Sequence, residues 1–182
     1  GLEIGPGGGQ KSSKGAGETR GNPGQLALER LVFFSDAVMA IAITLLVIDL
    51  KLPDLAAAEL PASLAGLTPR IMSFVISFAV IGVYWSSHHR YFGYICRSDG
   101  RLLLLNLVFL FFVVLMPFAA SMLGEYGYLP LGTVIYGAAV ASTGFAIAGL
   151  WRYASHRRRL IVKDVADDEI RRRNLVAFVV PT

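Results

Sequence analysis

The stretch RLVFFSDAVMAIAITLLVIDL, residues 30–50, decides the fold: it is an apolar run with an arginine at its start and a Ser-Asp pair inside it. Between residues 31 and 50, twelve Leu, Ile, Val and Phe residues favour bilayer insertion by roughly 5 kcal/mol, against up to about 3 kcal/mol for one Asp. The segment therefore predicts a transmembrane helix in which Asp36 needs a partner inside the protein.

The whole chain has the composition of an integral membrane protein. Its 182 residues have a mean hydropathy of +0.57, and only 16% are charged. We predict an all-α, polytopic helical membrane protein with four full transmembrane helices, at about 30–50, 71–93, 102–123 and 130–152, and a truncated fifth from 174. Residues 1–24, rich in Gly, Ser, Lys and Pro, are predicted to be a disordered N-terminal tail, with a transmembrane domain over 25–182.

The basic residues predict the orientation of the helices. Fifteen of the 17 Lys and Arg residues lie before the first span, around the second connection or after the fourth span. By the positive-inside rule these segments are cytoplasmic, and so is the N-terminus. This topology accounts for the net charge of +4, so we expect membrane lipid as a partner, and neither nucleic acid nor a soluble substrate.

Polar residues near the cytoplasmic ends of three spans predict a layer at one depth. Asp36 and Asn106 lie inward of their helix ends, which favours a packed hydrogen-bond network. Simple contact with lipid headgroups explains Arg30 or His89 equally well. The candidate layer consists of Arg30, Ser35, Asp36, His88, His89 and Asn106.

The first helix also carries an aliphatic stripe on a different face. Ile41, Leu45 and Ile48 follow one another at helical spacing, flanked by Thr44, and Asp36 points about 140° away from Ile41. Periodicity alone allows this stripe to contact lipid or other helices of the bundle.

The motif R-x-x-x-F-S-D at Arg30, Phe34, Ser35 and Asp36, followed by AVMAIAITLLVIDLKLP, resembles the signature of the transmembrane protein 175 family of potassium channels. SFVISFAVIGVYWSSHHRYF is similar to the family's second helix, and RLLLLNLVFLFFVVLMPF to its third. The resemblance covers about residues 30–151.

The resemblance implies a potassium-selective channel in the plasma membrane of a prokaryote. It implies a homotetramer whose first helices line a central pore, with six helices per subunit where this chain shows four and the start of a fifth. It implies constriction rings of Ile41, Leu45 and Ile48, with Thr44 contributing to selectivity. Arg30, Phe34, Ser35 and Asp36 are then structural residues that lock the pore helix. Potassium is the permeating species, and no cofactor or metal site is expected.

The sequence leaves three alternatives to a channel. An enzyme is not expected, because three histidines are too few for a membrane di-iron site and no nucleophile-base-acid set occurs. A secondary transporter uses broken helices and charged residues near the bilayer midplane, where this first helix is aliphatic. The third alternative is a non-conducting fragment of such a channel.

The predicted topology is testable by labelling with a thiol reagent that cannot cross the membrane. In a Cys96→Ser background, a cysteine at position 57 is expected to react from outside and one at position 166 only from the cytoplasm. Reaction of both from the same side would contradict an even number of spans between them.

Overall fold

The computed structural model describes residues 23–50, 66–156 and 160, which form four long helices and one short 3-10 helix. The helices are α1 (Pro23–Leu45), α3 (Thr68–Phe92), α4 (Gly100–Tyr126) and α5 (Pro130–Ser155), with the 3-10 helix η1 at Leu46–Asp49. All four are long and apolar enough to cross a membrane. The predictions of an all-α fold and of four spanning helices are confirmed. The predicted fifth stretch from 174 and the tail before Pro23 lie outside the described residues.

The first helix differs from its predicted bounds at both ends. It begins at Pro23, seven residues before the apolar run, and turns into η1 after Leu45. Proline suits the first position of a helix because the amide hydrogen it lacks would have no partner there. Gln25 also donates to Glu29 across one turn, at 3.5 Å. Hydropathy marks only the part of a helix inside hydrocarbon, so it could not predict this polar first turn.

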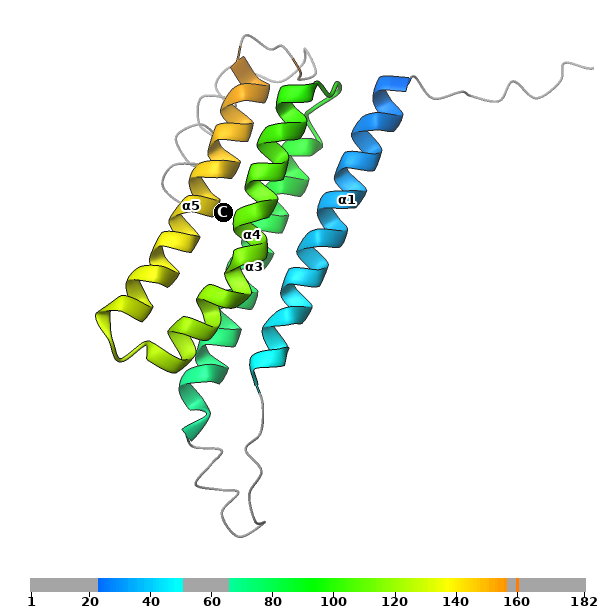
Figure 1. The fold of residues 1–182 in the computed structure, drawn as a ribbon. Helices are drawn as coiled ribbons and strands as arrows, with labels where there is room; N and C mark the ends of the chain where they lie inside the picture. Colours follow the sequence, from blue (N-terminus) through cyan, green and yellow to red (C-terminus); the bar gives the residue numbers. More distant parts are fainter. Residues whose placement is uncertain (1–22, 51–65, 157–159, 161–182) are drawn as a thin grey trace, which may run out of the picture.

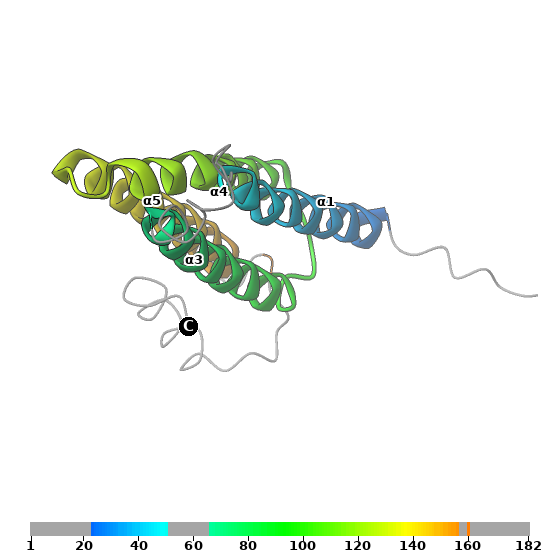
Figure 2. The same cartoon turned by 90° about the horizontal axis from the view of Figure 1, so that it is seen from below.

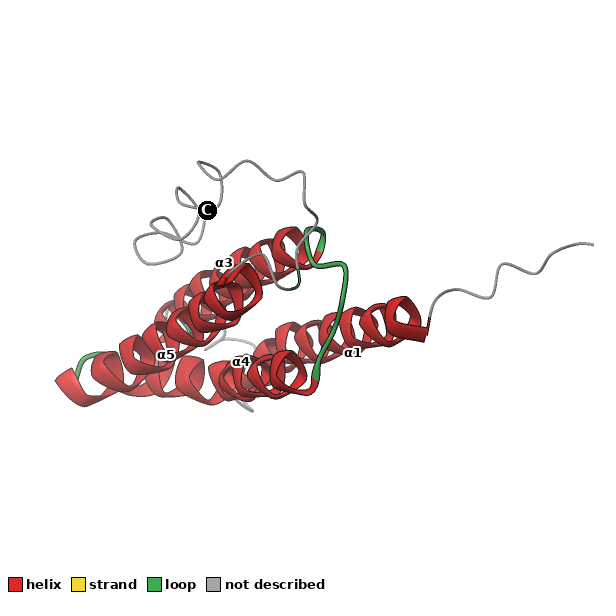
Figure 3. Ribbon diagram, turned by 90° about the horizontal axis from the view of Figure 1, so that it is seen from above, coloured by secondary structure: helices red, strands yellow, loops and turns green. Residues whose placement is uncertain are grey.

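The helices stand side by side, with α1 at one edge of the bundle and α5 at the other (Figure 1). The start of α1, the connection between α3 and α4, and the end of α5 lie at one end of the molecule. Both end-on views place α1 beside α3 and α4 (Figures 2 and 3). Side chains from all four helices meet in a core that includes Met39, Ile81, Phe109 and Trp151.

Helix α3 buries polar residues and exposes apolar ones. Its buried face includes four serine, tyrosine and histidine side chains that hydrogen-bond to α4 or α5, whereas Ile71, Met72 and Val75 are exposed. This inversion is expected in a bilayer, where apolar side chains gain nothing from burial away from lipid and polar groups bond across helices. The four residues on the buried face are Ser73, Ser77, Tyr84 and His88.

Tyr84 illustrates how α3 is attached to α5. Its hydroxyl donates to the carbonyl of Val140 at 2.7 Å, and its ring packs edge-on to Phe109 with 6.4 Å between centroids. A side chain added at Gly144 would approach the Tyr84 hydroxyl to 3.3 Å, so glycine permits this contact. The tyrosine thus joins α3, α4 and α5 at one level.

Removing this hydroxyl is expected to destabilise the bundle modestly. Tyr84→Phe should lower the free energy of unfolding by about 0.5–1.5 kcal/mol, the usual net contribution of one hydrogen bond in a protein. Unfolding in mixed detergent micelles, followed by circular dichroism, measures this change. Tyr128→Phe is the control, because Tyr128 is 79% exposed and its substitution should change nothing.

Candidate functional site

The candidate site lies where α1 meets α3 and α4 near the end of the bundle that holds the start of α1. Ser35 and Asn106 are fully buried and His88 is 1% exposed. Three hydrogen bonds connect them: Ser35 Oγ donates to Leu31 O at 2.8 Å, Asn106 Nδ2 donates to Ser35 Oγ at 2.8 Å, and His88 Nε2 lies 2.9 Å from Asn106 Oδ1. This chain of bonds, the Ser35–Asn106–His88 chain, links α1, α4 and α3.

The directions of these hydrogen bonds are fixed by Ser35. Its single hydroxyl proton points to Leu31 O, so its oxygen accepts a proton from the amide of Asn106. The carbonyl oxygen of Asn106 therefore faces His88, and the proton of the imidazole lies on Nε2. The hydrogen bonds therefore all run in one direction. The imidazole of His88 donates to the Asn106 amide oxygen, the Asn106 amide nitrogen donates to the Ser35 hydroxyl, and that hydroxyl donates to the Leu31 carbonyl.

Asp36 makes a separate contact at the edge of this region. Its Oδ1 accepts from Trp85 Nε1 at 3.0 Å, and the ring of Trp85 stacks on His89 with 5.7 Å between centroids. Asp36 is half-buried, since consecutive helical residues point about 100° apart and Ser35 takes the inward direction. The structure thus divides the single polar layer of the sequence prediction into two contacts.

The remaining residues of the predicted layer and motif lie toward the surface. Arg30 and His89 are exposed, and Phe34 is 50% exposed. Trp85 was missed by the sequence prediction, although its position one helical turn before His89 was a usable signal. An indole N–H inside a membrane helix also needs an acceptor, and Asp36 is the carboxylate at that depth.

The aliphatic stripe lies on the free side of α1 and continues onto η1, which contains Ile48. Ile41 is 58% exposed and Ile48 is 55% exposed, while Leu45 is 39% exposed. Thr44 is exposed too, and its hydroxyl donates to Ile41 O at 2.8 Å. The opposite face of α1 is buried and consists of Leu28, Leu31, Ser35, Met39 and Ala42, continued by Leu46 of η1.

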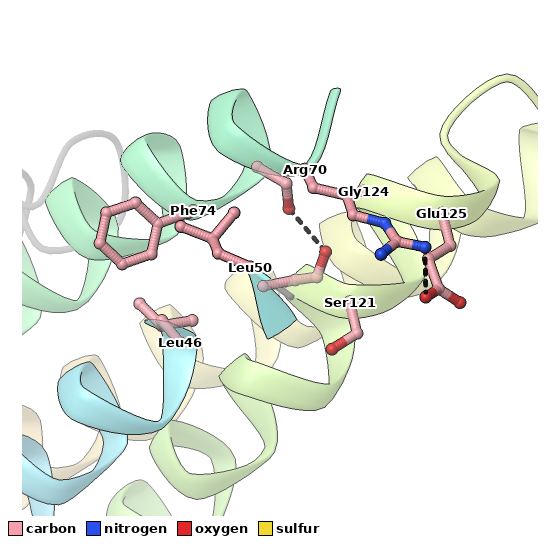
Figure 4. Close-up of a pocket in the computed structure, with 9 residues that line it drawn as sticks. Leu46, Leu50, Arg70, Phe74, Ser121, Gly124 and Glu125 are labelled. Atoms are coloured by element: carbon pink, nitrogen blue, oxygen red, sulfur yellow. Dashed lines mark hydrogen bonds and ion pairs between the residues drawn. The ribbon is translucent and has the colours of Figure 1, made fainter. Parts of the chain in front are cut away.

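At the far end of α1 the chain packs into a seam between α3 and α4 (Figure 4). Leu46 and Leu50 line a pocket there together with Phe74 and Ser121. Arg70 Nη2 lies 3.1 Å from Glu125 Oε1 beside this pocket, and both side chains are more than a third exposed. This ion pair joins α3 to α4, and at such exposure it contributes about 0–1 kcal/mol. The end of α1 is held by burial of Leu46, which is 2% exposed.

No group of three or more possible metal ligands occurs within the described ranges. The site consists of one helix, α1, which is attached on its buried side by hydrogen bonds and free on its aliphatic side. Together with the four spanning helices, this arrangement defines a polytopic helical membrane protein.

Comparison with known proteins identifies the family. The family model of the endosomal/lysosomal potassium channel TMEM175 matches residues 30–117. A potassium channel of Chamaesiphon minutus is 34% identical over 154 residues, which are 81% of this chain and 76% of that protein. The chain belongs to the TMEM175 family.

Two other relatives and one solved structure are also similar to this chain. A potassium channel of Streptomyces collinus is 36% identical over 130 residues, 67% of this chain and 62% of that protein. The human endosomal/lysosomal proton channel TMEM175 is 25% identical over 156 residues, 83% of this chain and 31% of that protein. The crystal structure of a lysosomal potassium-selective channel TMEM175 homolog from Chamaesiphon minutus superposes with a TM-score of 0.74 at 32% identity, covering 86% of this chain and 82% of that one.

The energetic importance of the Ser35–Asn106–His88 chain can be measured by a double-mutant cycle. Asn106→Ala should cost about 1–3 kcal/mol, because it leaves both the Ser35 oxygen and the His88 N–H buried without a partner. Ser35→Ala should cost less, and the double variant less than the sum of both, as expected for residues in contact. Additive costs would mean that the two side chains do not interact.

Proposed function

We propose that this chain is the subunit of a potassium-selective channel, in which four copies place their α1 helices around a central pore. The observation that carries the proposal is the two-sided character of α1. One face is buried against α3 and α4, and the other presents Ile41, Leu45 and Ile48 with no covering helix in the described part of the chain. Relatives and a homologous structure named as potassium channels support the same function.

Aliphatic rings give a physical basis for gating in such a pore. Ile41 points about 160° away from Met39, so packing Met39 into the core aims Ile41 at the free side. Four isoleucine side chains around a narrow axis hold water poorly, and the path closes by dewetting. Leu45 and Ile48 add rings farther along, and the threonine hydroxyls of Thr44 supply polar contacts for a partly dehydrated ion.

The polar residues have a structural role in this proposal. Ser35 and Asp36 bond to α4 and α3 on the side of α1 that faces away from the pore, so neither is an ion ligand. Arg30 and Phe34 are exposed, and we propose that they contact neighbouring subunits. The predicted fifth helix from 174, the cytoplasmic N-terminus and the plasma membrane of a prokaryote belong to the same proposal.

A secondary transporter is less well supported. Transporters bind their substrates near the membrane midplane with charged residues and broken helices. Between Arg30 and Asp49, Asp36 is the only ionisable residue of α1, and its carboxylate accepts a hydrogen bond from Trp85 of α3. A channel that conducts passively needs no such midplane site.

The pore assignment is tested by polar substitution of the stripe. Ile41→Asn should promote wetting at the narrowest ring, so potassium current through reconstituted bilayers should rise about tenfold or more while selectivity over sodium falls. Thr44→Ala should weaken selectivity more than conductance. Currents are measured with potassium and sodium on opposite sides.

The matched control for this test is Ile76→Asn on α3. Ile76 is also exposed, at 42%, whereas Ile43 packs against the buried core and is unsuitable. If Ile41→Asn and Ile76→Asn conduct alike, α1 does not line the pore. If the wild-type protein conducts no ions, the chain alone is a non-conducting fragment, and coupled uptake of a solute would indicate a transporter.

A further inference from the structure

A hollow lies at the end of the bundle opposite the start of α1, where α3 begins and α4 ends (Figure 1). It is lined by residues 66, 69 and 70 on the side of α3 and by residues 123–128 on the side of α4, and its volume is about 490 Å³. Cavities of this size hold small ligands. One basic and one acidic side chain line it, Arg70 and Glu125, and we call it the Arg70–Glu125 hollow.

The two charged side chains are close together but only weakly held. Arg70 Nη2 lies 3.1 Å from Glu125 Oε1, and the side chains are 38% and 45% exposed (Figure 4). An ion pair so exposed contributes little to stability. A guanidinium has five N–H donors, and this contact involves only Nη2. A ligand can therefore bind to both side chains without the loss of a strong contact.

Each of the two charges has the same sign as the end of its own helix. Helix α3 begins at Thr68, so Arg70 lies in its first turn, and α4 ends at Tyr126, so Glu125 lies in its last turn. The start of a helix carries a partial positive charge and its end a partial negative charge. The first turn of α3 has no acidic residue and the last turn of α4 no basic one. One half of the hollow is therefore positive and the other half negative.

Gly124 allows the two halves to lie side by side. A Cβ atom added there would lie 3.2 Å from Arg70 Cα and 3.4 Å from Arg70 Cγ, which is closer than most side chains approach one another. The glycine thus lets the start of α3 pack against the end of α4. A complementary ligand carries an anionic and a cationic group close together.

The Arg70–Glu125 hollow lies at the depth of lipid headgroups. Helix α3 has 25 residues and α4 has 27, so at 1.5 Å per residue each is about 40 Å long. The hydrocarbon of a bilayer is about 30 Å thick, so the ends of both helices lie among the headgroups. Tyr126, which is 42% exposed, has the amphipathic ring that is common at this level. Directly after Arg70, Ile71 and Met72 are exposed and offer an apolar surface to acyl chains.

We propose that the Arg70–Glu125 hollow binds a phospholipid whose headgroup combines a phosphate with a primary ammonium, as in phosphatidylethanolamine. Arg70 and the start of α3 bind the phosphate. Glu125 and the carbonyl groups at the end of α4 accept hydrogen bonds from the ammonium. The ring of Tyr126 adds a cation–π attraction for the same group. The site does not depend on the proposed channel function, because lipid binding needs only the membrane-spanning fold.

The experiment measures lipid binding to the full chain, purified in detergent, by native mass spectrometry with one dioleoyl lipid at a time. Phosphatidylethanolamine is compared with phosphatidylglycerol, which has the phosphate and the acyl chains but no ammonium. In Glu125→Gln the ratio of the two affinities should fall about fivefold, because only the ammonium loses a partner. In Arg70→Gln both lipids should bind about fivefold more weakly. Arg97→Gln, at an exposed position in the connection between α3 and α4, is the control and should keep the wild-type ratio.

A second measurement locates the lipid in the wild type, so it tests the site even where a variant does not fold. Phosphatidylethanolamine with a photoreactive group near its headgroup should label peptides that contain residues 66–72 or 123–128. Labelling confined to other segments would overturn the proposal, and so would an affinity ratio that Glu125→Gln leaves unchanged. Water-soluble phosphoethanolamine should not displace the lipid at equal concentration. If it does, the hollow recognises a free solute and the assignment to a membrane lipid is wrong.

The outcomes separate this inference from the proposed function. A protein that shows the expected lipid binding but no potassium current contradicts the channel alone. A protein that conducts potassium without preference for the ammonium headgroup contradicts the lipid site and leaves the channel assignment intact.

Discussion

The hydrogen bond between Asn106 and Ser35 is the interaction on which the attachment of α1 depends. It joins α1 to α4 in a region of the membrane where an unpaired amide costs far more than in water. Because the serine proton is committed to Leu31 O, the bond has only one possible direction. That direction sets the orientation of the Asn106 amide and the tautomer of His88, so one small side chain determines a network across three helices.

The two faces of α1 follow from the same constraint. A helix with polar groups on one side must turn that side into the protein, and its other side is then available for lipid, for another subunit or for a pore. Ser35 and Met39 are buried while Ile41 and Ile48 are exposed. Hydrophobicity cannot choose between these faces, because both are apolar along most of their length; the buried hydrogen bonds do so.

The sequence predicted the elements better than their contacts. Four apolar runs of sufficient length gave the four helices, since hydrocarbon thickness fixes the length of a span. The polar first turn of α1 was missed because it lies outside the apolar run. Asp36 was expected beside Asn106, but the structure pairs it with Trp85, since which of two adjacent residues points inward depends on how the helix is rotated against its neighbours.

The sequence by itself determined that this is a helical membrane protein with a polar motif needing partners inside it. It also carries the motif that resembles the family to which the chain belongs, because both features depend on residue type and spacing. Only the tertiary structure decided that Ser35 is buried, that Asp36 is half-buried, and that His88 retains a free nitrogen between two aromatic rings. Those facts depend on helix rotation and on side chains distant in sequence, which periodicity along a single helix does not contain.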